Sequence, residues 1–327
     1  MISRYGEKMK NLLVTGGSGF IGSNFIRHML GKYPDYKIIN LDKLTYAGNP
    51  DNLEDVENNP NYSFVCGDIC DPDVVSKVMQ RVDHVVHFAA ESHVDRSIED
   101  GSIFVRTNVL GTHTLLESAL KYNIMRFVHI STDEVYGSIL NGSSKETDIL
   151  TPSSPYSSSK AGSDLLAQSY HITHNLPMII TRCTNNFGPY QYPEKLIPLF
   201  VTNLVDNKKV PVYGTGQNVR DWIHVLDHCK AIDFVLHNGS IGEIYNVGCG
   251  AEKTNLEITQ KLLEILGKND SMIIYVEDRL GHDLRYSLDF SKLMEMGWAP
   301  EYDFNDGIKE TAKWYVDNRW WWEKLKH

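Results

Sequence analysis

The chain has 327 residues, of which 42% are hydrophobic, enough for one large domain with an appendage or for two modest domains. Its formal net charge of -10 argues against nucleic acid and against an acidic membrane surface as partners, because a polyanion requires clustered positive charge. An anionic small ligand remains compatible with this charge, since a local basic pocket can lie inside an acidic protein.

The cysteines and the hydropathy pattern predict the cellular compartment. The 5 cysteines are scattered, odd in number and without a Cys-x-x-Cys pair, so we expect reduced thiols rather than a disulfide framework. No stretch of the sequence has the roughly 18 consecutive apolar residues of a membrane helix, and the N-terminal residues lack the apolar core of a signal peptide. We expect a cytoplasmic protein with no membrane partner, in which residues 1–8 are a dispensable extension before Met9.

The first half of the chain repeats one pattern: a short strand of branched apolar residues, a turn, and a segment with helical spacing. The predicted strands are Asn11–Thr15, Lys37–Leu41, Ser63–Cys66, His84–Phe88, Phe127–Ser131 and Met178–Thr181. Strands that alternate with helices predict an α/β fold with a doubly wound, parallel Rossmann sheet.

The second half has several prolines, a helical stretch over Leu256–Leu266 and an aromatic tail from Trp314 to Trp322. We predict a domain over residues 1–185 and a smaller α/β lobe over most of residues 186–327. Within residues 220–247, the segments Val225–Leu236 and Ile244–Val247 are candidates for a return to the main sheet. The sequence therefore does not fix a sharp boundary between the domain and the lobe.

A glycine-rich turn, Gly16-Gly17-Ser18-Gly19-Phe20-Ile21-Gly22, joins the first predicted strand to a helix. Glycines let the backbone approach a pyrophosphate, whose charge is met by amide groups at the helix N-terminus. The spacing differs from Gly-x-Gly-x-x-Gly, so a turn required only for packing is the alternative. Asp42 ends the second strand, where a carboxylate can accept both ribose hydroxyls and would repel a 2′-phosphate. We therefore expect NAD as the cofactor and residues 1–185 as its domain.

Tyr156 and Lys160 lie four positions apart after Pro155, on one face of a predicted helix. The pair alone is common, but behind a nucleotide-binding strand series it resembles the short-chain dehydrogenase/reductase family. That resemblance implies that Tyr156 is a general base and that Lys160 lowers the pKa of its phenol. A shift from about 10 to about 7 takes roughly 4 kcal/mol, which one cation at about 4 Å supplies at an effective dielectric near 20.

The segment Ser131-Thr132-Asp133-Glu134-Val135-Tyr136-Gly137 narrows the resemblance to the extended members of this family, and among them to the dTDP-glucose 4,6-dehydratases. Relatives that only epimerise sugars carry small or hydroxyl residues in place of Asp133 and Glu134. Dehydration requires a base for the proton on carbon 5 and an acid for the hydroxyl on carbon 6. The resemblance assigns Glu134 as the base, Asp133 as the acid, and Thr132 with Tyr156 to the carbon 4 oxygen. The alternative is that the two acids begin a solvated loop.

The resemblance implies an NAD-dependent hydro-lyase that converts a nucleotide-diphosphate hexose, dTDP-glucose by preference, into the 4-keto-6-deoxy sugar. Hydride would pass from carbon 4 to NAD and return to carbon 6 after loss of water. An Asp133 that is protonated near pH 7 requires a pKa about 3 units above its ordinary value. A nucleotide-sugar epimerase or decarboxylase of the same fold and a non-catalytic NAD-binding module are the alternatives. The acid pair argues against the first, and the retained Tyr156 and Lys160 argue against the second.

The resemblance covers nearly the whole chain, including Asp42–Asn49, Ala89–Ser97 and Asn185–Tyr190. It assigns to the cofactor Gly16, Gly19, Phe20, Ile21, Gly22, Asp42, Lys43, Thr45, Asp68, Ile69, Ala89, Ala90, Ser92, Tyr156 and Lys160. Asp68 would contact adenine, although an aspartate at a strand end is as often a helix cap.

The predicted substrate residues follow from the same resemblance. They are Ser92, His93, Arg96, Thr132, Asn186, Lys195, Leu196, Arg220, Asn255, Arg279, His282 and Tyr286. A diphosphate carries about two negative charges, and planar guanidinium groups can bind its oxygens in a bidentate manner. Taken singly, a residue such as Arg220, Arg279 or Lys195 is more often a surface residue than a ligand, so these assignments rest on the resemblance.

Two histidine pairs, His171/His174 and His224/His228, have spacing that could suit a metal, but no carboxylate or cysteine completes a set. We expect structural roles for them and no metal. Helices near Ile103–Tyr122 and Tyr156–His174 form a dimer interface in relatives, which implies a homodimer. Their apolar spacing is equally compatible with packing on the sheet.

Overall fold

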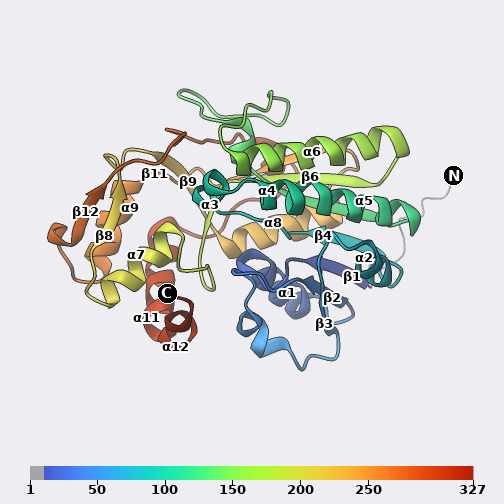
Figure 1. The fold of residues 1–327 in the computed structure, drawn as a ribbon, viewed down its shortest axis with the longest axis horizontal. Coiled ribbons are helices and arrows are strands. Elements are labelled where there is room, and N and C mark those ends of the chain that lie inside the picture. The colour runs from blue at the N-terminus through green and yellow to red at the C-terminus, as the bar shows by residue number, and fades with distance from the viewer. Residues whose placement is uncertain (1–10, 327) are drawn as a thin grey trace.

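The computed structural model describes residues 11–326, so the prediction for residues 1–8 falls outside the described residues. A central seven-stranded sheet organises the fold, with the order β10-β6-β5-β4-β1-β2-β3 and every neighbouring pair parallel (Figure 1). Its strands are β1 (Asn11–Thr15), β2 (Lys37–Asp42), β3 (Tyr62–Cys66), β4 (His84–His87), β5 (Arg126–Thr132), β6 (Met178–Cys183) and β10 (Ile244–Val247). The strand order reverses between β1 and β4, and doubly wound sheets bind ligands at such a switch point.

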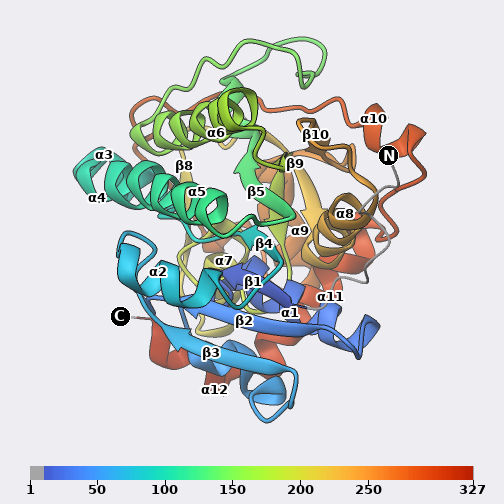
Figure 2. The same cartoon turned by 90° about the vertical axis from the view of Figure 1, so that its right-hand side faces the viewer.

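Helices cover both faces of this sheet (Figure 2). One face carries α1 (Phe20–Lys32) and α8 (Val225–Asn238), and the other carries α2 (Pro72–Met79), α5 (Thr112–Lys121) and α6 (Pro155–His174). Because both faces are covered at the centre of the sheet, strands such as β4 and β6 are buried throughout, whereas the edge strand β3 stays partly exposed. The predicted doubly wound α/β fold is confirmed.

Most predicted strand ends differ from the observed ones by one or two residues, and two differences bear on the site. Strand β5 continues to Thr132, because its pairing with β6 extends to Thr132 opposite Cys183. The acid pair therefore lies in the 3-10 turn η4 (Asp133–Tyr136). The helix predicted over 103–122 begins as α4 (Ser102–Phe104) and contains the π-helical stretch η3 (Val105–Gly111) before α5.

The remaining elements form a lobe beside the carboxyl ends of the main strands. Its strands make a three-stranded sheet, β11-β9-β7, and a pair, β12-β8. They are β7 (Asn185–Phe187), β8 (Val210–Tyr213), β9 (Val219–His224), β11 (Glu252–Thr254) and β12 (Ile273–Val276). Its helices are α7 (Leu196–Val205), α9 (Asn255–Ile265), α10 (Ser291–Glu295), α11 (Phe304–Asp317) and α12 (Arg319–Trp322). The remaining short elements are α3 (Val94–Glu99) and the 3-10 turns η2 (Pro50–Val56), η5 (Asp270–Met272) and η6 (Glu323–Leu325).

The chain crosses between the lobe and the main sheet more than once. Val225–Leu236 lies within α8, and Ile244–Val247 forms β10 beside β6. Where the cofactor and substrate domains divide functionally remains a prediction. Within residues 11–326, no helix has the length and apolarity that crossing a bilayer requires.

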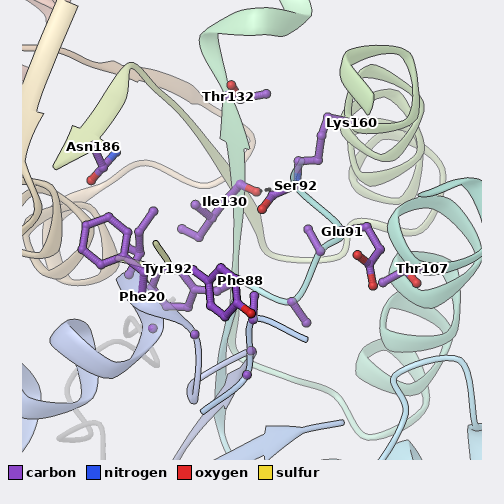
Figure 3. Close-up of a pocket in the computed structure, with 18 of the residues that line it drawn as sticks. Phe20, Phe88, Glu91, Ser92, Thr107, Ile130, Thr132, Lys160, Asn186 and Tyr192 are labelled. Carbon is purple, nitrogen blue, oxygen red and sulfur yellow. Dashed lines mark hydrogen bonds between the residues drawn. The ribbon is translucent and has the colours of Figure 1, made fainter. Parts of the chain in front are cut away.

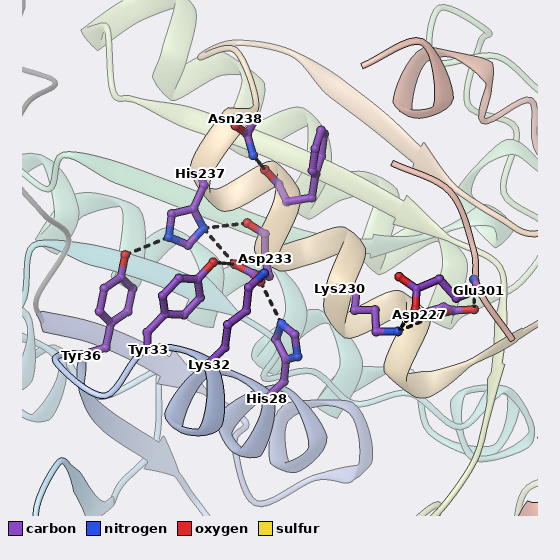
Figure 4. Close-up of polar contacts among 11 residues, drawn as sticks. His28, Lys32, Tyr33, Tyr36, Asp227, Lys230, Asp233, His237, Asn238 and Glu301 are labelled. Carbon is purple, nitrogen blue, oxygen red and sulfur yellow. Dashed lines mark hydrogen bonds and ion pairs between the residues drawn. The ribbon is translucent and has the colours of Figure 1, made fainter. Parts of the chain in front are cut away.

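A polar cluster joins α1 to α8 on one face of the sheet (Figure 4). The buried carboxylate of Asp233 accepts hydrogen bonds from Lys32 Nζ at 2.7 Å and Tyr33 OH at 2.9 Å, and it lies 2.8 Å from His28 Nε2. His237, one turn along α8, lies 2.9 Å from the same carboxylate. Helix α1, which begins at the glycine turn, is thereby fixed to α8 by charge-assisted bonds.

Candidate active site

A cavity of about 330 Å³ lies where the carboxyl ends of β1, β2, β4 and β5 meet the start of α6 (Figure 3). It is lined by every residue predicted for the cofactor and by every residue predicted for catalysis. The residues predicted for the cofactor and for catalysis thus line one continuous cavity, although the role of each residue remains a prediction.

The glycine turn brings backbone unusually close to the end of β4. Gly16 has φ +70°, and a Cβ atom there would lie 2.6 Å from the backbone N of Ala89. A Cβ atom at Gly22 would lie 2.4 Å from the carbonyl O of Gly16. Gly19 precedes α1 without a side-chain cap, so the first amide groups of the helix are left to an anion or to water. The alternative that these glycines serve packing alone does not account for this uncapped terminus, which faces the cavity.

Asp42 lies at the floor of the cavity and is buried. Its carboxylate accepts hydrogen bonds from the backbone N–H of Ser18 at 2.9 Å and of Leu44 at 2.8 Å. Burial raises the pKa of Asp42, while these backbone bonds oppose the shift. Asp68 accepts a hydrogen bond from Lys43 Nζ at 2.8 Å. The alternative role of Asp68 as a helix cap is wrong, because Asp71 caps α2.

Helix α6 presents Tyr156 and Lys160 to the cavity. It begins at Pro155 after a capping box in which the side chains of Ser154 and Ser157 bond reciprocally to backbone N–H groups. The Nζ atom of Lys160 donates a hydrogen bond of 2.7 Å to the carbonyl O of Ile130 on β5. Burial lowers the pKa of Lys160 to about 8, so its ammonium form still predominates at neutral pH.

The predicted lowering of the Tyr156 pKa is wrong for the chain alone. Burial raises the pKa of Tyr156 well above its ordinary value, and the neighbouring charges of Glu134 and Asp133 add to the rise. The sequence argument considered the cation on the same helix face and overlooked the two anions at the end of β5.

The acid pair follows β5 directly. Asp133 is 3% exposed, and its Oδ1 accepts a hydrogen bond of 3.1 Å from Thr132 Oγ1. Its Oδ2 is buried and has no hydrogen-bond partner among residues 11–326. Burial and the charge of Glu134 raise the pKa of Asp133 to about 7. The alternative of a solvated loop is therefore wrong.

Glu134 lies between the acid partner and a group of cations. Burial raises its pKa, while the charges of Arg279, Lys195 and Arg220 oppose the rise. Burial thus raises the pKa of both acids. Arg220 opposes the rise at each of them, and Arg279 and Lys195 also oppose it at Glu134.

A second cavity of about 200 Å³ adjoins the first and shares Glu134, Asn186 and Lys195 with it. The predicted substrate residues that line it are His93, Asn186, Lys195, Leu196, Arg220, Asn255, Arg279 and His282. Ser92 and Thr132 line the first cavity.

Two predicted substrate residues line neither cavity. The guanidinium of Arg96 lies 3.8 Å from the ring centroid of Tyr46 and donates a hydrogen bond of 3.2 Å to Glu194. The guanidinium of Arg220 lies over the ring of Tyr286, 4.2 Å from the ring centroid. The hydroxyl of Tyr286 donates a hydrogen bond of 2.5 Å to Asp283. The predicted contact of Arg96 and Tyr286 with the substrate stays a prediction.

The sequence analysis missed several residues that line the cavities. They include Glu91, Thr107, Ile130, Thr184, Gln191, Tyr192, Glu194, His228, Phe200 and Trp222. Thr184 follows the end of β6, so the strand pattern could have indicated it. Thr107 and Tyr192 come from a π-helical stretch and a loop, where no periodic signal marks an inward side chain (Figure 3).

The histidine pairs have identifiable structural contacts. His228 Nδ1 lies 2.9 Å from Asn186 Oδ1, and burial lowers the pKa of His228 to about 3. The side chain of His224 caps α8, and His171 Nδ1 donates to the carbonyl O of Leu176. No group of three metal-ligating side chains occurs in the part of the chain that the structure describes.

Comparison with known proteins decides the family. The model of the GDP-mannose 4,6 dehydratase family matches residues 13–311. The chain belongs to this family. Among curated relatives, dTDP-glucose 4,6-dehydratase from Streptomyces niveus is 54% identical over 320 residues, covering 96% of this chain and 95% of the relative.

Solved structures place the chain within the family. DesIV, a dTDP-glucose 4,6-dehydratase from Streptomyces venezuelae with NAD and TYD bound, is 56% identical with a TM-score of 0.95. The alignment covers 97% of this chain and 100% of DesIV. A UDP-glucose 4-epimerase from Thermus thermophilus in complex with NAD is 30% identical with a TM-score of 0.87, covering 94% of this chain and 99% of the epimerase. The predicted resemblance to dTDP-glucose 4,6-dehydratases is confirmed, and the epimerase alternative is not favoured.

Proposed function

We propose that the protein is an NAD-dependent dTDP-glucose 4,6-dehydratase, a hydro-lyase that forms a 4-keto-6-deoxy sugar nucleotide. The observation that carries this proposal is the acid pair at the end of β5, with Asp133 buried and Glu134 half-buried, in the cavity that Tyr156 and Lys160 also line. A related 4-epimerase needs no acid for a leaving hydroxyl, whereas a dehydratase does.

The dinucleotide part of the cavity fits NAD. The uncapped start of α1 suits a pyrophosphate, and the buried Asp42 carboxylate suits a ribose without a 2′-phosphate. When bound, NAD supplies the reversible oxidation of the sugar at carbon 4. Gly16, Gly19, Asp42 and Asp68 would hold the adenosine diphosphate half, and Ser92 would lie along the remainder of the cofactor.

Tyr156 would take the proton from the hydroxyl on carbon 4, with Thr132 donating a hydrogen bond to the same oxygen. For this role the pKa of Tyr156 must fall, against the burial and the two anions that raise it. The ammonium group of Lys160 favours the phenolate, and the positive nicotinamide ring adds to that effect. We infer that the tyrosine is activated only in the assembled complex.

Asp133 and Glu134 would then divide the dehydration between them. Glu134 takes the proton from carbon 5, which the ketone at carbon 4 makes acidic. Asp133, with its pKa raised to about 7, donates a proton to the leaving hydroxyl on carbon 6. Asp133 and Glu134 line the same cavity, so the sugar does not have to move between the two steps.

The second cavity would receive the nucleotide diphosphate. Arg220, Arg279 and Lys195 line it and bring positive charge to an acidic protein. Asn186 lies at the junction of the two cavities, where a sugar nucleotide would pass from one to the other. In this proposal residues 1–185 with the return near 220–247 bind NAD, and residues 186–327 mainly bind substrate.

We further propose a cytoplasmic homodimer. All five cysteines, Cys66, Cys70, Cys183, Cys229 and Cys249, are free, as is usual in a reducing compartment. Large apolar side chains on the helices near 103–122 and on α6 are exposed, among them Val105, Leu110 and Leu165. Exposed apolar residues on two neighbouring helices suit an interface with a second copy.

The proposal is tested by incubating the purified protein with NAD and, in turn, dTDP-glucose, UDP-glucose and GDP-mannose, followed by mass spectrometry of the products. Loss of one water from dTDP-glucose, faster than from the other two, is the expected result. An unchanged mass with inverted stereochemistry would identify an epimerase instead.

A further inference from the structure

A chain of three buried hydrogen bonds connects the C-terminal helix to the dinucleotide site. Trp321 Nε1 donates to Asn52 Oδ1 at 2.8 Å, and Asn52 Nδ2 donates to the carbonyl O of Ser18 at 2.9 Å. The backbone N–H of Ser18 donates to Asp42 Oδ2 at 2.9 Å. Trp321, Asn52 and Ser18 are each 1% exposed, and Asp42 is 8% exposed.

The position of Trp321 is fixed by an aromatic cluster. Its ring centroid lies 5.2 Å from that of Trp314 and 5.7 Å from that of Tyr190, both in edge-to-face arrangements. Helix α12 is near the C-terminus yet lies at the η2 segment that follows β2 (Figure 2). The indole N–H is therefore held rigidly against Asn52, 269 positions earlier in the chain.

Asn52 acts on the peptide that opens the nucleotide-binding helix. The carbonyl of Ser18 belongs to the same peptide plane as the N–H of Gly19, directly before α1. That carbonyl accepts one further hydrogen bond, of 3.0 Å, from the backbone N–H of Asn49. Fixing the Ser18 carbonyl therefore fixes the direction of the amide groups at the start of α1, which line the cavity together with Asp42.

We propose that Trp321 is a positioning residue for NAD: through Asn52 it holds the glycine turn in the orientation that binds the pyrophosphate and the ribose. This inference rests on the proposed function, because it assumes that NAD occupies the first cavity. Neither Trp321 nor Asn52 lines that cavity, so their effect on it is indirect, and the side-chain bonds lead to Ser18. Replacing Trp321 by Phe keeps a large aromatic ring but leaves the buried Asn52 Oδ1 without its donor.

The neighbouring Trp322 provides a matched control. It is 0% exposed, and its Nε1 donates one buried hydrogen bond of 2.7 Å to the carbonyl O of Tyr315. Its bond leads into the lobe rather than to the glycine turn. Trp322→Phe therefore removes the same indole group from the same core without interrupting the chain to Ser18.

The experiment measures how fast the holoenzyme exchanges its NAD for isotopically labelled NAD, together with kcat at saturating NAD and the melting temperature. We expect Trp321→Phe to exchange about tenfold faster than wild type, with kcat within about twofold. Trp322→Phe should lose similar thermal stability but keep the wild-type exchange rate.

A second variant guards against misfolding of the first. Asn52→Ala interrupts the chain at its middle, and the double variant with Trp321→Phe should exchange no faster than Asn52→Ala alone, because both act through one path. Wild-type exchange in Trp321→Phe, equal acceleration in Trp322→Phe, or additive effects in the double variant would overturn the inference. Failure of the wild-type protein to bind NAD at all would instead overturn the proposed function, and the inference with it.

Discussion

Lys160 and Ile130 connect the two elements that carry the chemistry: the ammonium group on α6 donates a 2.7 Å hydrogen bond to a carbonyl two residues before Thr132 on β5. Through this bond the helix that bears Tyr156 is held in register with the strand that ends at the acid pair. In the proposed mechanism Lys160 is therefore both the cation that favours the Tyr156 phenolate and a structural link between α6 and β5.

Replacing Lys160 by Met should lower kcat by about 100-fold or more, because the Tyr156 phenol loses its cation and cannot act as base near neutral pH. Steady-state kinetics across pH 6–9 measures the loss. Lys292→Met is the matched control, since Lys292 Nζ donates a 2.6 Å hydrogen bond to the carbonyl O of Ile244 on β10, away from the cavity. If Lys292→Met reduces kcat as much as Lys160→Met, the effect is structural and the assignment of Lys160 is refuted.

Replacing Asp133 by Asn should slow loss of water by about 100-fold or more, because an amide cannot donate the proton that the carboxyl group supplies. Oxidation at carbon 4 does not require Asp133, so reduced cofactor should accumulate during a single turnover. Absorbance at 340 nm in a stopped-flow instrument follows this accumulation. A variant that dehydrates at the wild-type rate would show that Asp133 is not the acid.

Replacing Arg279 by Ala should raise the Kd for dTDP-glucose by about 10- to 150-fold, because a charge-assisted contact to the diphosphate contributes roughly 1.5–3 kcal/mol. Arg279 lines the second cavity, and its buried Nε atom has no hydrogen-bond partner among residues 11–326. Arg285→Ala is the control, since Arg285 pairs with Glu252 at 2.6 Å and lines neither cavity. Calorimetric titration with dTDP-glucose distinguishes the two, and unchanged affinity in Arg279→Ala would remove Arg279 from the site.

Replacing Asp233 by Asn should reduce the free energy of unfolding at pH 7 by about 2–4 kcal/mol, because it leaves the surrounding cations without their buried partner. Burial alone would raise the pKa of Asp233, but hydrogen bonds from His237, His28, Lys32 and Tyr33 outweigh burial and lower it.

The sign of the pH dependence follows from that lowered pKa. The stabilisation by Asp233 is fully present above the unfolded-state pKa of about 4 and is lost as the pH falls towards the lower folded-state pKa. Urea unfolding at pH 7 and pH 3 should show a difference between wild type and Asp233→Asn that shrinks in acid. Glu301→Gln, which removes an exposed partner of Lys230, should change stability by less than about 0.5 kcal/mol at either pH. An equal difference at both pH values would contradict the role of the Asp233 charge.

The features that could be predicted from the sequence are those that depend on residues close together in the chain. Alternating strands and helices predicted the doubly wound sheet, and the glycine turn with Asp42 predicted the dinucleotide cavity, because both depend on residues close in the chain. The acid pair was visible because it follows a strand end directly.

What the sequence could not predict depends on contacts between distant segments. The raised pKa of Tyr156 arises from its burial and from the charges of Glu134 and Asp133, which act on it only because the fold brings them together. The contacts of Arg96 with Tyr46 and Glu194 likewise join segments that are distant in the sequence. The bond from Trp321 to Asn52 joins the two ends of the chain, and no periodic pattern marks either residue.

The most direct test of the account is the fate of the hydrogen on carbon 4. The enzyme is incubated with dTDP-glucose that carries deuterium at carbon 4, in ordinary water, and the product is examined by nuclear magnetic resonance. We predict that the deuterium is found on carbon 6 of the 4-keto-6-deoxy product, without net accumulation of reduced cofactor. Release of the label into water, or its retention at carbon 4, would contradict the account.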